Sequence, residues 1–176
     1  MSQKKDRLLR DKFILDACCG GRYFWFDKHH ENTLYIDIRE EEPGCNPHRP
    51  NFCVKPDIVM DFRHLKFNDK TFKLIVWDPP HLKSLGETSV MRMTYGCLHN
   101  ETWTYDLKTG FNELWRVLED YGVLVFKWHE SEIPLKEVLK LFHTKPLFGN
   151  PTNSGETTKW CCFMKIPKDK KPEEIP

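Results

Sequence analysis

The chain has 176 residues, with 27 lysines and arginines against 26 aspartates and glutamates and a formal net charge of +1. This length predicts one domain, and the balanced charge argues against a strongly basic nucleic-acid-binding domain while leaving room for a local basic patch. No apolar run is long enough to span a bilayer and no apolar signal segment begins the chain. Seven cysteines without such a signal favour free thiols in the cytoplasm.

Seven short apolar runs predict strands. They are expected at residues 13–17, 33–37, 57–60, 74–77, 122–128, 140–147 and 159–166. Most run without strict alternation, which suits a mostly parallel sheet covered on both faces. Because helical stretches separate the strands, we expect an α/β fold: a three-layer, doubly wound, Rossmann-like, seven-stranded and mostly parallel sheet.

Helices are expected between these strands, at residues 21–30, 111–121 and 133–142. In the second of them, apolar residues from Phe111 to Leu118 recur at the spacing of one buried face, and Gly122 stands where a C-cap glycine belongs. Residues 40–55 form a proline-rich loop, and residues 81–109 form a long polar and aromatic insertion. We expect one domain over residues 1–166 and a disordered, charged tail over residues 167–176.

Four aspartates follow successive predicted strands: Asp16, Asp37, Asp61 and Asp78. Any one of them can be an ordinary helix N-cap or turn residue. In a doubly wound fold, however, the carboxyl ends of the strands meet at one edge, and ligands bind beyond that edge. Four carboxylates in succession therefore predict a shared functional edge.

The first aspartate opens the run Asp-Ala-Cys-Cys-Gly-Gly, residues 16–21, and Asp37 lies 21 residues further on. An acid at that distance from a glycine turn can accept hydrogen bonds from a ribose. The run lacks the G-x-G-x-x-G pattern of dinucleotide sites, and glycines beside the acidic Asp16 suit a positively charged ligand better than a phosphate. S-adenosylmethionine (SAM) fits, with its ribose at Asp37, its adenine amine at Asp61 and its ammonium and sulfonium near Asp16.

Residues 16–21 resemble, in variant form, the first motif of class I SAM-dependent methyltransferases. Residues 76–81, Val-Trp-Asp-Pro-Pro-His, resemble the Asp-Pro-Pro-Tyr motif of amino-methyltransferases that act on nucleic-acid bases. The two motifs stand in that family's order, the resemblance covers about residues 12–166, and residues 16–37 also look like small phage methyltransferases. The resemblance implies a SAM site at Asp16, Ala17, Cys18, Gly20, Asp37, Ile38, Asp61 and Phe62, and a transfer site at Asp78, Pro79, Pro80 and His81.

An exocyclic amine on a base is a poor nucleophile because the ring delocalises its lone pair. Asp78 and the Pro79 carbonyl can accept its hydrogen bonds and direct the lone pair at the methyl group, and the prolines make this turn rigid. The expected reaction is methyl transfer to such an amine, with N6 of adenine in DNA as the expected acceptor. His81 stands where the family has Tyr, Phe or Trp, which leaves RNA, a small molecule or a protein amide as alternative acceptors. A non-catalytic SAM-binding protein is the alternative from another class.

The insertion at residues 81–109 combines cations and aromatic rings that suit phosphates and bases, although a lid or a solvated loop would look similar. These residues are Lys83, Arg92, Tyr95, His99, Trp103 and Tyr105.

Cys45, His48 and Cys53 match no standard zinc spacing and lack an obvious fourth ligand, so no metal is expected. The segment 127–129, Lys-Trp-His, can touch the substrate or serve the core equally well. The oligomeric state stays open.

Overall fold

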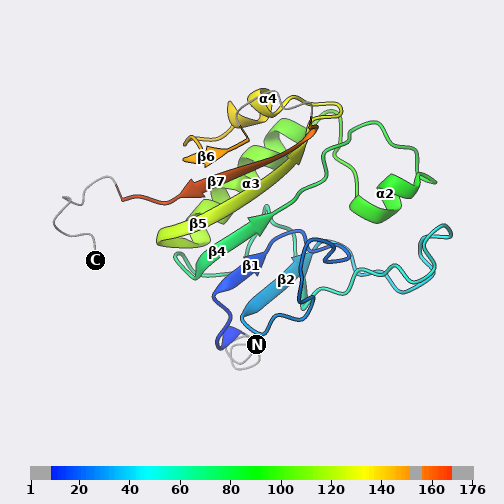
Figure 1. Ribbon diagram of the computed structural model, residues 1–176, viewed down its shortest axis with the longest axis horizontal. Coiled ribbons are helices and arrows are strands. Elements are labelled where there is room, and N and C mark those ends of the chain that lie inside the picture. The colour runs from blue at the N-terminus through cyan, green and yellow to red at the C-terminus, as the bar shows by residue number, and fades with distance from the viewer. Residues whose placement is uncertain (1–8, 151–155, 168–176) are drawn as a thin grey trace.

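The computed structural model describes residues 9–150 and 156–167. Seven strands form one sheet in the order β3-β2-β1-β4-β5-β7-β6 (Figure 1). The strands are β1 (Ile14–Asp16), β2 (Thr33–Asp37), β3 (Ile58–Val59), β4 (Phe72–Trp77), β5 (Leu118–His129), β6 (Phe148–Gly149) and β7 (Thr158–Met164). Strands β1 to β5 are parallel, and β7 and β6 continue the sheet antiparallel. The predicted seven-stranded, mostly parallel sheet is confirmed.

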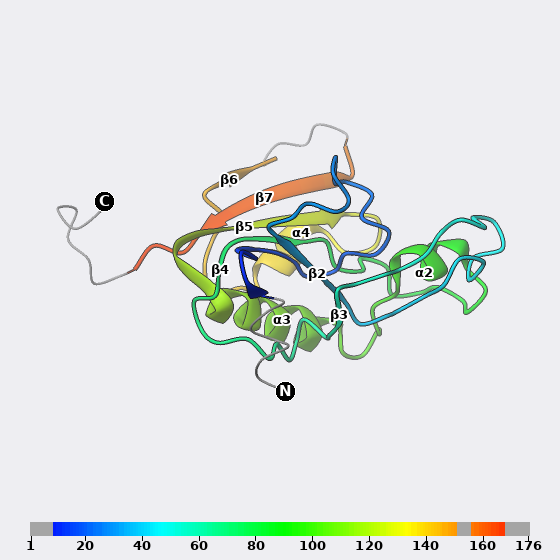
Figure 2. The same ribbon diagram turned by 90° about the horizontal axis from the view of Figure 1, so that it is seen from below.

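The helices are α2 (Val90–Tyr95), α3 (Trp103–Val117) and α4 (Leu135–Leu139). Figure 2 shows α3 and α4 on one side of the sheet, with the connection from β1 to β2 on the other. On the helical side the ring of Phe111 in α3 stacks on Phe142, just after α4, with centroids 4.1 Å apart. Trp77 of β4 packs against Phe142 at 5.9 Å, so this face holds the aromatic core.

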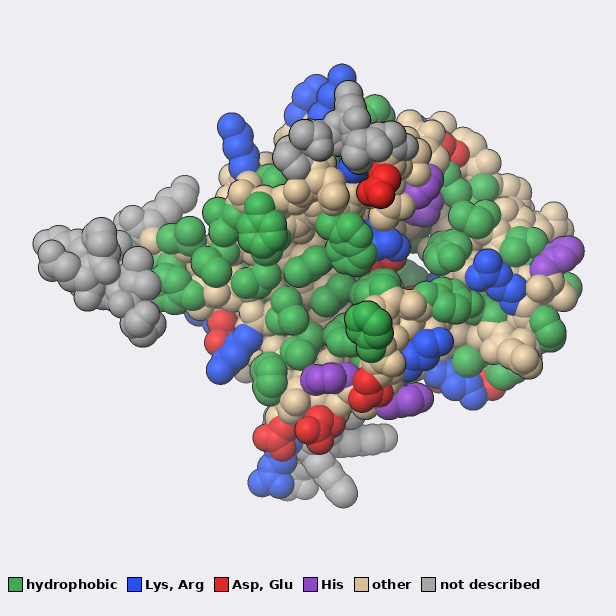
Figure 3. Space-filling model, viewed as in Figure 1, with side chains coloured by type: hydrophobic (Ala, Val, Ile, Leu, Met, Phe, Trp, Pro, Cys, Tyr) green, Lys and Arg blue, Asp and Glu red, His purple; other side chains and the backbone are tan. Residues whose placement is uncertain are grey.

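The opposite face of the sheet is apolar but only partly covered. The strand register puts Val76, Val125, Cys162 and Phe148 on this one face, and Phe148 is 69% exposed. Hydrophobic side chains gather over these strands in Figure 3. One of the two expected helical layers is therefore replaced by turns.

The helix predicted at residues 21–30 is wrong, because tertiary contacts in this segment outweigh its helical pattern. Arg22 takes a left-handed backbone conformation with φ 54°, and its guanidinium lies 3.7 Å from the centre of the Tyr35 ring. It also donates hydrogen bonds to the carbonyls of Lys28 and Lys55. Trp25 is drawn toward the sheet edge by a hydrogen bond to Asp16.

The helix predicted at residues 111–121 exists, but α3 begins at Trp103 and ends at Val117. The insertion predicted at residues 81–109 is therefore shorter at its C-terminal end. Gly122 is not a helix cap, since β5 begins directly at Leu118 and contains it. The Lys165 ammonium caps α3 instead, donating hydrogen bonds of 2.6 Å to the Trp115 carbonyl and 2.7 Å to the Leu118 carbonyl.

The strand predicted at residues 140–147 is also wrong. Helix α4, shorter than the predicted 133–142, is followed by turns, and the strand of this region is the short β6. Phe142 shows why: its side chain is 7% exposed and packs on α3 rather than extending along a sheet. The tail predicted at residues 167–176 lies, apart from residue 167, outside the described residues.

The parallel strands end at a common edge, and α2 lies beyond it, beside the proline-rich loop between β2 and β3 (Figure 1). A buried hydrogen bond of 3.0 Å from the Asn46 side chain to the Thr94 hydroxyl joins this loop to α2. Within residues 9–150 and 156–167, no helix has the length and apolar character needed to cross a membrane.

Candidate active site

A cavity of about 830 Å³ lies at the carboxyl edge of the parallel strands. Its position beside β1 and β4 is the switch point where doubly wound sheets bind ligands, and its volume is typical of a ligand site. Ten of the twelve predicted site residues line it: Cys18, Gly20, Asp37, Ile38, Asp61, Phe62, Asp78, Pro79, Pro80 and His81. The other two, Asp16 and Ala17, lie beneath its wall, 0% and 1% exposed.

Asp16, the last residue of β1, is a fully buried carboxylate, and no Lys or Arg of residues 9–150 and 156–167 contacts its oxygens. Its Oδ2 accepts a hydrogen bond of 2.7 Å from the Trp25 indole, and its Oδ1 accepts one of 3.2 Å from the Cys18 amide. Burial raises the pKa of Asp16 to about 7, against the opposing effect of these two hydrogen bonds. Nearby Asp78 and Asp37 raise it further. A cation bound here would favour the charged carboxylate.

The turn after β1 brings a backbone amide to the end of β2. Gly20 has φ +45°, and a Cβ added there would meet no atom within 4 Å, so the missing side chain leaves space toward the cavity. The Gly20 amide donates a hydrogen bond of 2.9 Å to Asp37 Oδ2. Arg39 engages the other oxygen through its amide at 3.0 Å. The Arg39 Nε also donates to this oxygen, at 3.4 Å. A carboxylate has about four acceptor positions, so Asp37 retains capacity for about one further hydroxyl donor.

Asp61, after β3, is more heavily engaged than a free hydrogen-bond acceptor would be. The Arg63 guanidinium binds both of its oxygens, at 2.6 to 3.0 Å, and reaches Asp106 of α3 at 2.6 Å. Burial opposes ionisation of Asp61, but the Arg63 hydrogen bonds prevail and lower its pKa. The predicted contact of Asp61 with an adenine amine would therefore have to share this carboxylate with Arg63.

Phe62 forms an apolar wall beside Asp61. Its ring packs on Trp77 at 5.5 Å and directly over Gly110 in the middle of α3, where an added Cβ would collide with it. This close approach explains a glycine inside a helix, where it normally destabilises.

Asp78, directly after β4, faces a cation. Its Oδ2 lies 2.6 Å from Lys127 Nζ, and Lys127 comes from the neighbouring strand β5. Burial raises the pKa of the Asp78 carboxyl, and the Lys127 ammonium opposes that rise. Pro79 is buried and Pro80 packs near Gly96, which follows α2.

His81 lies beside a second histidine. Its ring is 4.9 Å from His129 of β5 and 6.4 Å from Trp128. Burial lowers the pKa of His81 to about 4, helped by the charges of His129 and Lys127, so the ring is neutral near pH 7. A neutral imidazole offers a flat face for stacking.

Four of the six residues singled out in the insertion line the cavity: Lys83, Arg92, Tyr95 and His99. Trp103 lies instead in a second hollow, and Tyr105 is 63% exposed on α3. Within the described part of the chain, no group of three or more His, Cys, Asp or Glu side chains could hold a metal ion.

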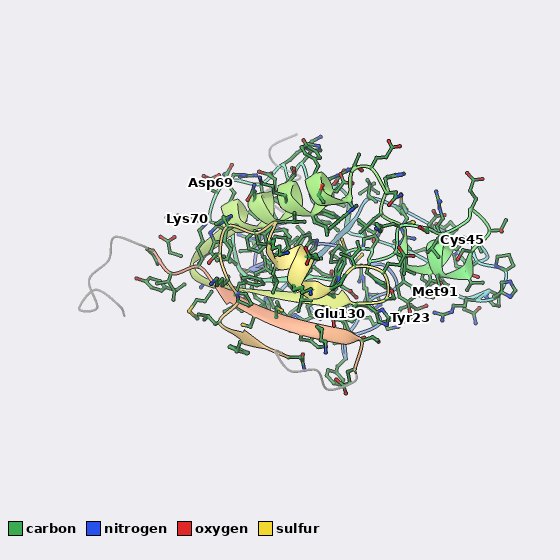
Figure 4. The ribbon with its side chains drawn as sticks, turned by 90° about the horizontal axis from the view of Figure 1, so that it is seen from above. Tyr23, Cys45, Asp69, Lys70, Met91 and Glu130 are labelled. Atoms are coloured by element: carbon green, nitrogen blue, oxygen red, sulfur yellow. The ribbon has the colours of Figure 1, made fainter. Side chains whose placement is uncertain are left out.

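The prediction missed several lining residues. Tyr23 lines the cavity from the β1–β2 connection and Met91 from α2, and Figure 4 labels both. Arg39 and Arg63 each stand two residues after a predicted aspartate, a spacing that could have identified them. Lys127 was not missed in the same sense, because it belongs to the segment 127–129 for which substrate contact or a core role was expected. It lines the cavity, and its pairing with Asp78 was not predicted.

No protein-family model and no curated protein sequence matches the chain. Many solved structures resemble it, among them these three. The antibiotic-resistance methyltransferase Kmr is 11% identical with a TM-score of 0.51, over 93% of this chain and 92% of that chain. An rRNA methylase from Streptococcus thermophilus is 12% identical with a TM-score of 0.51, over 92% and 94%. Geranyl diphosphate methyltransferase in complex with GPP and sinefungin is 10% identical with a TM-score of 0.51, over 94% and 77%. This chain has the fold of class I SAM-dependent methyltransferases.

Proposed function

We propose that this protein is a SAM-dependent methyltransferase that acts on an exocyclic amine of a nucleic-acid base, with N6 of adenine in DNA as the first candidate. One observation carries the proposal. Asp78 and His81 of the Asp-Pro-Pro-His segment line the same cavity as Gly20 and Asp37, the residues suited to a nucleoside cofactor. A donor and an acceptor could therefore meet in one enclosed space.

The residues at the β1 and β2 ends suit SAM. Asp16 has a raised pKa of about 7 because burial leaves its charge uncompensated, and a cationic ligand would supply the missing charge. Gly20 leaves open space where other residues would carry a side chain. Asp37 lies at the end of β2 and can accept a hydrogen bond from a ribose hydroxyl beside its contacts with Gly20 and Arg39.

The chemistry proposed for Asp78 is hydrogen-bond acceptance and orientation. SAM supplies an electrophilic methyl group, whose bond to sulfur breaks as the amine lone pair forms the new N–C bond. Asp78 accepts a hydrogen bond from the amine and directs the lone pair, and the buried Pro79 keeps this turn rigid. The methylated nitrogen then loses its extra proton to water.

The acceptor side of the cavity suits a nucleotide. Lys83 and Arg92 supply positive charge for phosphates, while Tyr95 and the neutral His81 supply ring faces for a base. Because an extruded or single-stranded base costs less to bind than a paired one, we expect single-stranded substrates to react faster than duplexes.

RNA is the second candidate acceptor. One protein of similar fold carries a name that suggests it, the rRNA methylase from Streptococcus thermophilus. A fold shared at this identity is compatible with either nucleic acid, and acceptor identity follows from the site alone.

The test is transfer of a tritiated methyl group from SAM to unmodified DNA, total RNA, protein extract or a pool of small amines, offered separately. Products are digested and identified by mass spectrometry. Methyladenine in DNA, absent with Asp78→Ala and present with Asp69→Ala, is the expected result. Label in RNA bases would change the proposed substrate from DNA to RNA and leave the proposed mechanism in place. Label only in protein or small amines, or none despite SAM binding, would overturn the proposal.

A further inference from the structure

The contacts of Asp78 use its two oxygens unequally. Lys127 Nζ lies 2.6 Å from Oδ2, whereas no residue of the described chain donates a hydrogen bond to Oδ1. The Lys127 and Asp78 side chains are 27% and 18% exposed, so the pair is set into the cavity wall rather than solvated outside it. One acceptor oxygen of this cavity-lining residue is thus occupied, and the other has no donor among the described residues.

The pairing follows from strand register. Trp77 of β4 pairs with Phe126 of β5 in parallel, so the next residues, Asp78 and Lys127, emerge side by side at the carboxyl edge. Lys127 is also held on its other side, where it pairs with Trp160 of β7. Groups carried by paired strands are held more precisely than groups on loops.

Two aromatic rings complete the surroundings of the ammonium. Lys127 Nζ lies 5.6 Å from the centre of the Phe24 ring and 5.9 Å from that of Trp160. At these distances a ring face attracts a cation. The carboxylate and the two rings together fix the ammonium at one position beside Asp78.

We propose that Lys127 is a positioning residue for methyl transfer: it keeps Asp78 ionised and holds Oδ2, so that Oδ1 receives the N–H of the acceptor amine. This inference rests on the proposed function. It also narrows the acceptor, because an amine that already carries a positive charge would be repelled by Lys127. Neutral amines, such as those conjugated to a base, are the acceptors that this pair favours.

The first test needs no acceptor. In full-length protein with carbon-13-labelled aspartate, the Asp78 carboxyl is titrated by NMR and assigned by its loss in Asp78→Asn. Asp16 and Cys18 on the β1 side, and Lys127 and His129 on β5, are the titratable groups around it. Lys127→Met should move the titration midpoint upward by about 1–3 pH units, and Lys127→Arg should restore it. An unchanged midpoint in Lys127→Met would overturn the inference.

The second test is kinetic. Lys127→Met should lower kcat about 100-fold while KM for SAM changes less than about threefold, since the loss concerns orientation of the acceptor. Lys127→Arg should recover part of the rate, because it restores the positive charge beside Asp78. The recovery should be incomplete, because the guanidinium fork can also reach Oδ1 and compete there with the acceptor amine. The control is Lys73→Met, at an exposed lysine of β4. A Lys127→Met enzyme as fast as the wild type, or faster, would overturn the positioning role.

The two tests separate the inference from the function on which it rests. If the midpoint moves as expected but no nucleic acid is methylated by the wild type, the proposed function fails while the Asp78–Lys127 coupling stands. If nucleic acid is methylated and the midpoint does not move, the function stands and the role of Lys127 is wrong.

Discussion

The ends of β1 and β4 each carry an aspartate, and the two carboxylates have different surroundings: Asp16 is fully buried, and the Asp78 side chain is 18% exposed. Among the described residues, the donors to Asp16 are neutral, the Trp25 indole and the Cys18 amide, and its pKa rises to about 7 because it is buried. Asp78 has its own cation in Lys127, 2.6 Å away. Under the proposed function, the Asp16 carboxylate suits a ligand that brings positive charge, and the Asp78 carboxylate suits one that brings none. That division fits a cationic methyl donor at β1 and a neutral amine at β4.

Removal of the Asp78 carboxylate should have the largest effect on methyl transfer of the changes predicted for these two aspartates. Asp78→Ala should reduce methyl transfer at least about 10³-fold, because the acceptor amine loses the group that orients it. Its affinity for SAM, measured by calorimetry, should stay within a few-fold of wild type, since the residues at the ends of β1 and β2 are unchanged. Asp69→Ala is the matched control, at a carboxylate that is 73% exposed and lies far from the cavity (Figure 4). Full activity of Asp78→Ala would remove the acceptor role of this carboxylate.

Gly110→Ala should disturb Phe62, which forms a wall of the cavity on the proposed SAM-binding side. The added methyl collides with the Phe62 ring and lies 3.2 Å from Trp77, so we expect a cost of about 1–3 kcal/mol in the free energy of unfolding. Helix propensity alone predicts the opposite, a gain of about 1 kcal/mol. Urea denaturation distinguishes the two signs. Gly86→Ala, where a Cβ would meet nothing within 4 Å, should stay within about 0.5 kcal/mol.

The pH dependence of SAM affinity should report the charge state of Asp16. With a pKa of about 7, this carboxyl is mostly protonated at pH 6 and mostly charged at pH 8, so SAM affinity should rise about tenfold between them. Asp16→Asn should remove that dependence and Asp69→Asn should keep it. Equal dependence in Asp16→Asn would assign the titration to another group.

The same carboxyl affects stability without ligand. Its pKa in the folded protein lies above the unfolded value of 3.8, so the folded form binds the proton more tightly. The resulting stabilisation is complete below about pH 4 and is lost as pH rises through about 7. The Tm of the ligand-free wild type should therefore fall over this range more steeply than that of Asp16→Asn.

His81 should give the smallest effect. Because its pKa is lowered to about 4 by burial, it is neutral between pH 6 and pH 8 and should contribute no limb to the pH profile of kcat in that range. His81→Phe keeps a flat ring and should change KM for the acceptor less than about threefold, whereas His81→Ala should raise it more, through lost stacking. A titration near neutrality that disappears in His81→Phe would show that the imidazole exchanges protons during the reaction.

The position of the four aspartates at one edge of the sheet could be predicted, because it depends only on where the strands end and on their being parallel. Apolar runs alternate with polar segments, and strands of a parallel sheet necessarily bring their carboxyl ends to one side. Asp16, Asp37, Asp61 and Asp78 each follow such a run, so their shared edge needs no knowledge of individual contacts. The Asp-Pro-Pro-His segment could also be identified from the sequence, because its four residues are consecutive.

Other elements depended on contacts that local patterns do not encode. Residues 21–30 carry a helical pattern, yet Arg22 and Trp25 are bound to distant groups and the helix does not form. Residues 103–110 look polar and end in glycine, yet they form the first part of α3, in which Leu107 is buried and Gly110 lies against the Phe62 ring. Here tertiary packing outweighs intrinsic propensities worth less than about 1 kcal/mol per residue.

What the sequence alone determined about this protein is the class of the sheet, the row of carboxylates and the segment that resembles a transfer motif. Only the tertiary structure decided the partner of each carboxylate: Trp25 for Asp16, Arg63 for Asp61 and Lys127 for Asp78. The physical reason is separation along the chain. Asp78 and Lys127 are 49 residues apart, and no periodicity spans that interval. Their contact arises from the register of two neighbouring strands, which the folded sheet alone specifies.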